Sequence, residues 1–158
     1  MLLGCDPSGA GDTGSEVPLA SYSCELGTLG TDGWVSLADA GTVELMLGFQ
    51  GFVLASLAVR ADGPPEGLSR AAYGLEIEGT DPVSGSQPDV GFSGGESDEV
   101  LAFFTGNYVS YYVGRSAHVA LRLTSATAEC VAEGDAVLVD DDPCIHTGGE
   151  PDCPEGGT

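Results

Sequence analysis

Between residues 17 and 142 the chain alternates apolar and polar residues with a period of two. In one run Val43, Leu45 and Leu47 fall on one face, and Glu44 falls on the other. Similar alternation recurs in about eight short runs, which is typical of strands with one buried face. Clusters of Gly, Pro, Asp and Ser separate the runs, as they do in turns. No run carries a sustained helical stripe with capping residues. The pattern therefore predicts an all-β domain.

Three runs add detail to this pattern. Residues 52–59 are apolar on both faces, which is typical of a central strand covered on both sides. Residues 108–113 are rich in tyrosine and valine, and we expect a strand here as well. Residues 127–139 form the last expected strand, which Gly134 and Asp135 would interrupt as a bulge or a tight turn.

The spacing of runs and turns predicts an antiparallel β-sandwich of about eight strands. Its rhythm resembles that of immunoglobulin-like domains, and a jelly roll is the competing arrangement. The resemblance does not extend to the Cys–Trp–Cys pattern of immunoglobulin domains, because Trp34 follows Cys24 closely whereas Cys130 is too distant. We expect three parts: a terminal segment and tether (1–16), the β-sandwich (17–142) and a tail rich in Pro, Gly and Cys (143–158).

The first residues indicate where the protein resides. Leu2-Leu3-Gly4-Cys5 is similar to the lipobox of bacterial lipoproteins, and residues 6–15 after it are polar and glycine-rich. Only four residues precede Cys5, fewer than the charged and apolar regions of a signal peptide. The resemblance implies a lipid on Cys5 and an extracytoplasmic protein, periplasmic or at the cell surface, anchored to a bacterial membrane. The other interpretation of Cys5 is a free or disulfide-bonded cysteine.

The number of cysteines fits an exported protein. There are five: Cys5, Cys24, Cys130, Cys144 and Cys153. An odd number leaves one unpaired, and lipidation of Cys5 would account for it. The other four allow three pairings, of which we favour Cys24–Cys130 and Cys144–Cys153. Such pairs indicate an oxidising compartment.

Acidic residues outnumber basic ones by far. The chain has 25 acidic residues against four arginines and no lysine, so its formal net charge is −21. Binding to nucleic acid needs a basic surface, so no nucleic-acid partner is expected. The same charge disfavours docking on anionic lipid headgroups. The simplest role of this charge is solubility.

Candidate catalytic residues are few. His118 falls at an outward position of a predicted strand, and the residues around Ser86 do not complete a Gly-x-Ser-x-Gly motif. Glu76 and Glu78 share a strand face, about 7 Å apart by strand geometry, and such a pair would suit glycoside hydrolysis. A solvated sheet face explains the same pattern. We therefore expect no catalytic residues.

The acidic loops and the cysteine-containing tail hold the candidate metal ligands. Calcium prefers several oxygen ligands from acidic loops. The residues that would supply them at the end of the domain are Asp140, Asp141 and Asp142. A second acidic loop holds Glu96, Asp98 and Glu99. Zinc would need Cys144, His146 and Cys153 in the tail, but their spacing is not that of a zinc knuckle. We expect no cofactor, with calcium as the alternative.

Aromatic residues offer a candidate ligand platform. If Tyr111 points inward, Tyr108 and Tyr112 share the opposite face of the expected strand with Ser110. Exposed tyrosines can stack on sugars or anchor a protein interface. Ordinary cross-strand packing is the other interpretation.

The sequence thus predicts a lipid-anchored β-sandwich with a non-catalytic binding or structural role at the cell envelope, where its partner is a protein or a glycan. Two alternatives remain open. One is a polysaccharide hydrolase that uses loop carboxylates, and the other is a calcium-dependent adhesion module. No feature of the sequence indicates an oligomeric state.

Overall fold

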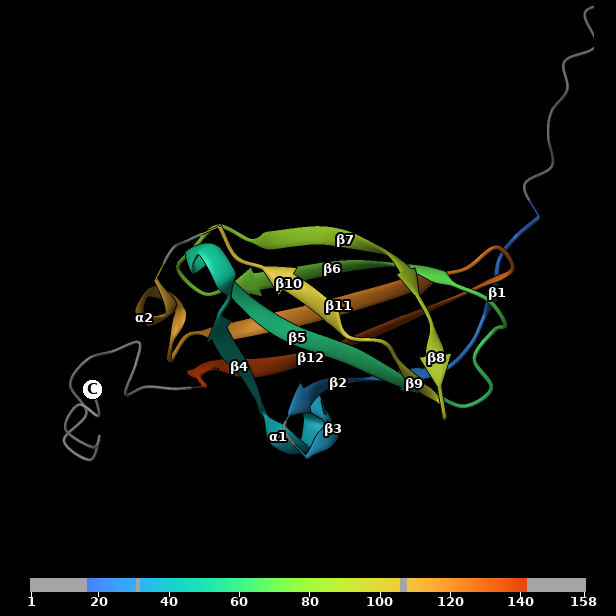
Figure 1. The fold of residues 1–158 in the computed structure, drawn as a ribbon, viewed down its shortest axis with the longest axis horizontal. Coiled ribbons are helices and arrows are strands. Elements are labelled where there is room, and N and C mark those ends of the chain that lie inside the picture. Colours follow the sequence, from blue (N-terminus) through green and yellow to red (C-terminus); the bar gives the residue numbers. More distant parts are fainter. Residues whose placement is uncertain (1–16, 31, 106–107, 142–158) are drawn as a thin grey trace, which may run out of the picture.

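The computed structural model describes residues 17–30, 32–105 and 108–141, most of which lie in strands (Figure 1). The strands are β1 (Ala20–Ser21), β2 (Cys24–Gly30), β3 (Gly33–Ser36), β4 (Thr42–Leu47), β5 (Val53–Ala61), β6 (Ser69–Ile77), β7 (Val83–Val90), β8 (Phe92–Ser93), β9 (Glu96–Ser97), β10 (Val100–Phe103), β11 (Ser116–Thr124) and β12 (Ala128–Asp140). The helices are α1 (Leu37–Ala40), the 3₁₀ turn η1 (Phe49–Gly51) and α2 (Val109–Tyr112). None of these helices is long and apolar enough to cross a membrane.

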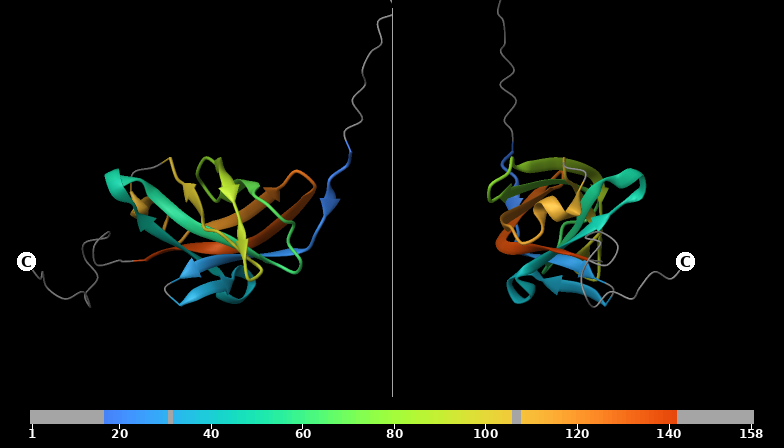
Figure 2. Two further views of the ribbon diagram at one scale, coloured as in Figure 1. Left: turned by 45° about the vertical axis from the view of Figure 1, so that its right-hand side comes forward. Right: turned by 90° about the vertical axis from the view of Figure 1, so that its left-hand side faces the viewer.

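The strands form one mixed sheet that curls into a half-barrel (Figure 2). Its main order is β3-β2-β5-β4-β12-β11-β6-β7. Strands β12, β11, β6 and β7 make long antiparallel ladders, which form one wall. Strand β5 occupies the other wall, where it pairs with β2, β4, β9 and β10. The concave side of the sheet is filled by apolar side chains from both walls.

The all-β prediction is confirmed, whereas the two antiparallel sheets of a sandwich are replaced by this single sheet. Two strand pairs are parallel: β1 with β12, and β12 with β4. Immunoglobulin-like and jelly-roll arrangements both need two sheets, so neither describes the observed layers. Alternation along a strand reports which face is buried. It carries no information on which strand lies alongside, or in which direction.

The buried faces agree with the alternation in the sequence. On β6, Tyr73, Leu75 and Ile77 point into the core. On β11 the alternate residues, including Val119 and Leu121, do the same. Strand β5 is buried on both faces over most of its length, as the apolar run 52–59 predicts. The period of two was therefore a reliable signal for burial.

The expected interruption at Gly134 is absent. Strand β12 continues through it, and Gly134 pairs with Val119 within an unbroken ladder. A β-carbon at residue 134 would lie 3.2 Å from the Leu37 side chain, which α1 inserts into the core. The glycine thus provides space for Leu37. A register shift of the kind expected here occurs instead on the β6–β7 ladder, between Ser69 and Ala71.

The predicted disulfide Cys24–Cys130 is confirmed, and it joins β2 to β12. It links residues 106 positions apart in the sequence. The second predicted pair, Cys144–Cys153, lies outside the described residues, as do the lipobox with Cys5 and the acidic residue Asp142.

Candidate functional site

Exposed apolar side chains gather at one end of the half-barrel. The turn η1, the end of β10 and helix α2 all lie at this end, and β1 lies at the opposite end (Figure 1). On these elements and the residues that flank them, six large apolar residues are exposed: Leu47, Phe52, Phe103, Tyr108, Tyr111 and Val113. We call these six residues the aromatic end. Their exposed fractions run from 37% for Val113 to 74% for Tyr108, so each offers surface to a partner.

Contacts between rings hold the aromatic end in place. Phe52 and Phe103 meet edge to face, with ring centres 6.4 Å apart. The next residue of the chain, Phe104, points inward and packs on Tyr112 at 4.8 Å. Tyr112 in turn packs on Tyr111 at 5.0 Å. Such edge-to-face pairs stabilise beyond the area that they bury. Of the exposed rings, Tyr111 therefore rests on the buried pair Phe104 and Tyr112, while Phe52 and Phe103 support each other.

Arg115 fixes Tyr111 from outside. Its guanidinium lies 5.0 Å from the Tyr111 ring centre. Its Nε donates a hydrogen bond of 2.7 Å to the Tyr111 carbonyl, and its Nη1 donates one of 3.1 Å to the Glu78 carbonyl. Helix α2 is thereby tied to the end of β6. A ring held from both sides loses little conformational freedom when a partner binds.

The turn around η1 presents Leu47 and Phe52. The Gly48 N–H donates to the Phe52 carbonyl at 2.8 Å, which closes the turn between β4 and β5. Gln50 and Gly51 both have positive φ, at 72° and 78°. This left-handed conformation suits glycine and is unusual for glutamine. The tight turn leaves the two apolar side chains that flank it about half exposed.

The aromatic end is built from stretches without charge. Residues 45–59 and 100–114 contain no Asp, Glu, Lys, Arg or His, in a chain whose net charge is −21. The ladder between β5 and β10 joins these stretches, from Val100 opposite Leu57 to Phe103 opposite Leu54. Part of this absence of charge reflects burial of the two strands. The same absence continues into the exposed turn and helix, which burial does not explain.

The two tyrosines of the predicted platform differ in exposure. Tyr108 is exposed, but Tyr112 is 2% exposed and belongs to the core. Residues 109–112 form helix α2, where the expectation was a strand. On a helix, residues three apart share a face, so Val109 and Tyr112 both point inward. Tyr111, which was expected to point inward, is half exposed.

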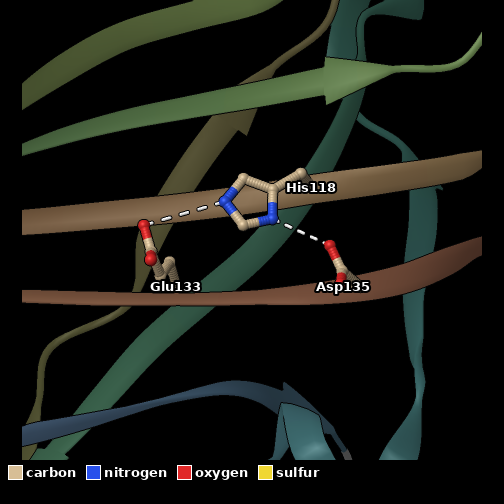
Figure 3. A network of polar contacts seen from close by, with 3 residues as sticks. All are labelled: His118, Glu133 and Asp135. Atoms are coloured by element: carbon tan, nitrogen blue, oxygen red, sulfur yellow. Dashed lines mark hydrogen bonds and ion pairs between the residues drawn. The ribbon is translucent and has the colours of Figure 1, made fainter.

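A second cluster, around His118, lies on the convex face of β11 and β12 (Figure 3). His118 Nδ1 lies 2.8 Å from Asp135 Oδ1, and its Nε2 lies 3.7 Å from Glu133 Oε2. The hydrogen bond with Asp135, together with the charges of both carboxylates, raises the pKa of His118 above its ordinary value. As predicted, His118 is a surface residue of a strand.

The surroundings of His118 are acidic. Glu76 is its register neighbour on β6, and Glu76 and Glu78 are both exposed there. Together with Ser116 and Asp135 they line a shallow hollow of about 380 Å³. Within the described chain, the hydrogen-bond partner of His118 is a carboxylate and not a serine or cysteine. The arrangement can hold a proton or attract a cation, and it lacks the nucleophile–histidine contact of acyl-transfer enzymes.

Several of the carboxylates proposed for calcium have other partners in the described part of the chain. Glu96 forms an ion pair of 2.6 Å with Arg60, and Asp98 accepts a hydrogen bond of 2.7 Å from the Gly91 N–H. Asp140 and Asp141 lie at the end of β12. In residues 17–30, 32–105 and 108–141, no three His, Cys, Asp or Glu side chains are grouped to hold a metal.

No protein-family model, curated protein or solved structure matches this chain.

Proposed function

We propose that this protein is a lipid-anchored, extracytoplasmic module that binds a protein partner through its aromatic end and catalyses no reaction. One observation carries the proposal. Six exposed apolar side chains lie on two charge-free stretches of an otherwise strongly acidic chain. The cores of protein interfaces are likewise rich in aromatic residues and poor in charged ones. Rings that are already held in place, as here, make effective anchors.

The position of the aromatic end suits an anchored protein. The first described residue, Val17, leads into β1, at the opposite end of the half-barrel (Figure 2). A lipid on Cys5 would attach the domain by that opposite end, so the aromatic end would face away from the membrane. The disulfide Cys24–Cys130 supports an oxidising compartment.

The chemistry of the aromatic end favours a protein over a glycan. Phe52 and Phe103 carry no hydrogen-bonding group, and only Tyr108 and Tyr111 contribute hydroxyls. A sugar needs polar partners beside the ring on which it stacks, whereas an apolar protein surface does not. Because the rest of the molecule is acidic, the partner should surround its apolar patch with neutral or basic residues.

Site-specific photo-crosslinking in the native host tests this proposal. A photoreactive phenylalanine at position 108 should crosslink to one envelope protein. The same group at Val131, an exposed apolar residue of β12, should not. The double variant Phe52→Ser/Phe103→Ser should abolish the crosslink, since it removes the two apolar rings without touching residue 108. Equal labelling from both positions, or none from position 108, would refute the proposal.

A glycan array probed with the purified domain separates the two kinds of partner. If the domain binds one glycan class and Phe52→Ser/Phe103→Ser abolishes that binding, the partner is a glycan and not a protein.

The lipid anchor is tested by the intact mass of the mature protein. We expect a chain that begins at Cys5 with added acyl mass, and loss of membrane association in Cys5→Ala. An unacylated chain would contradict the lipid anchor. The binding role of the aromatic end would still be tested separately by the crosslinking experiment.

A further inference from the structure

On one edge of β10, side chains form the hydrogen bonds that the backbone of a neighbouring strand would normally form. Gln87 of β7 donates through Nε2 to the Glu99 carbonyl at 2.8 Å, and its Oε1 accepts from the Leu101 N–H at 3.1 Å. The Phe103 N–H donates to the Tyr73 hydroxyl at 3.1 Å. The other edge of β10 pairs with β5 in the ordinary way. Side chains thus bridge the seam between β7 and β10.

Local backbone features allow these two side chains to reach the seam. Tyr73 is the register partner of Gly85 on β7. A β-carbon at residue 85 would overlap the Tyr73 ring and hydroxyl, so only glycine lets the ring cross β7 towards β10. Next to Gln87, the β6–β7 ladder shifts register, and Asp89 adopts a positive φ of 57°. Such irregularities re-aim the side chains beside them.

The seam is connected directly to the aromatic end. Phe103 is the last residue of β10, and its own N–H is the group that Tyr73 binds. Its ring is about half exposed and packs edge to face on Phe52. β10 has four residues, and the Phe104 N–H continues its pairing with β5 through the Val53 carbonyl. On the other edge of β10, the Phe103 N–H is held by the Tyr73 hydroxyl.

We propose that Tyr73 and Gln87 are positioning residues of the aromatic end, which hold β10 so that Phe103 stays packed against Phe52 in the orientation that the partner binds. This inference rests on the proposed function. Neither residue belongs to the six exposed apolar residues, and Tyr73 is 8% exposed. Both act through β10, so their removal changes the binding surface without removing any part of it.

Hydrogen exchange tests the structural half of this inference. Tyr73→Phe deletes the hydroxyl and keeps the ring. We expect the Phe103 amide to exchange roughly tenfold faster, because a hydrogen bond contributes about that factor. The Leu121 amide of β11 should be unchanged. Tyr22→Phe is the matched control, since it removes another buried tyrosine hydroxyl, near β1. Unchanged exchange at Phe103, or equal acceleration at Leu121, overturns the inference.

Crosslinking tests the functional half. At a temperature where every variant is folded, Tyr73→Phe and Gln87→Ala should each lower the crosslinking yield from position 108 severalfold. Ser84→Ala, an exposed change on the same strand as Gln87, should not. Faster exchange at Phe103 with an undiminished yield would overturn the positioning role alone. Absence of any crosslink in the otherwise unchanged protein would refute the proposed function, and the exchange experiment would still decide whether Tyr73 holds β10.

Discussion

Several strand glycines make room for large side chains from neighbouring residues. Gly27 lies under the Trp34 indole, and a β-carbon there would overlap the ring. The same indole carries the Arg60 guanidinium, 4.1 Å from the ring centre. Gly85 makes room for Tyr73 in the same way, and Gly134 makes room for Leu37. In a sequence, a glycine within a strand indicates a bulge or a close approach, and only the neighbouring atoms distinguish the two.

Gly27→Ala should destabilise the fold by about 1–3 kcal/mol, the usual cost of forcing extra volume into a packed site. The added methyl group would overlap both the Trp34 ring and the Val35 carbonyl oxygen. The measurement is urea unfolding followed by circular dichroism. Gly74→Ala is the matched control, because a β-carbon at this strand position meets nothing within 4 Å. Similar losses in both variants would contradict the packing role of Gly27.

His118 should titrate above its ordinary pKa of 6.5, since Asp135 and Glu133 favour its protonated form. Asp135→Asn should lower the pKa of His118, as it removes the largest cause of the rise. Glu129→Gln is the control, because Glu129 pairs with Arg122. NMR titration of the His118 ring protons measures all three pKa values. No difference between the parent protein and Asp135→Asn would contradict the contact.

The raised pKa of His118 fixes the sign of its contribution to stability. Protonation is favoured in the folded state, so the stabilisation is fully present below pH 6.5, the unfolded value. It is lost as the pH rises through the folded value. The ring is exposed, so the effect on stability is small, and the NMR titration is the sharper measurement.

At the scale of elements, the segment 108–113 shows how tertiary packing overrides local preference. Tyrosine and valine favour strands. Here four of these residues form helix α2, because one helical turn places Val109 and Tyr112 against the core while Tyr111 stays outside. Burial of two large side chains outweighs a preference of at most about 1 kcal/mol. Which side of the segment would meet the core was not encoded in its own residues.

The disulfide between β2 and β12 should be a main source of stability. In the chain-entropy model, a loop of this size contributes about 4–5 kcal/mol by restricting the unfolded chain. The double variant Cys24→Ser/Cys130→Ser should lose a stability of that order in guanidinium unfolding. The double variant Cys144→Ser/Cys153→Ser serves as control, since it leaves this loop closed. An unchanged unfolding midpoint without Cys24 and Cys130 would contradict the prediction.

At the scale of the whole molecule, few of the negative charges are neutralised by a cation. Among the four arginines, Arg60 and Arg122 form ion pairs with carboxylates. Arg115 and Arg70 bind carbonyl and hydroxyl oxygens. The remaining carboxylates repel one another over a small surface, which destabilises the compact state. The two stretches that supply the aromatic end add nothing to this repulsion, since they hold no charge.

Salt should therefore stabilise the fold. Raising NaCl from about 0.01 to 1 M shortens the screening length from roughly 30 to 3 Å. We expect the melting temperature to rise by several degrees, because repulsion in the folded state is screened more than repulsion in the expanded chain. Scanning calorimetry measures the melting temperature in NaCl and in KCl, and the two salts should raise it equally. A melting temperature that falls, or that follows the identity of the cation, would contradict general screening.

The sequence by itself determined the all-β class, the buried faces of the main strands, the Cys24–Cys130 pair and the surface position of His118. Each depends on a local period or on a short list of pairings. Tertiary structure decided the single curled sheet, the parallel neighbours of β12, the helix at 109–112 and the gathering of the aromatic end. These features depend on contacts between residues far apart in the chain. The alternation of apolar and polar residues does not reveal the energies of those contacts.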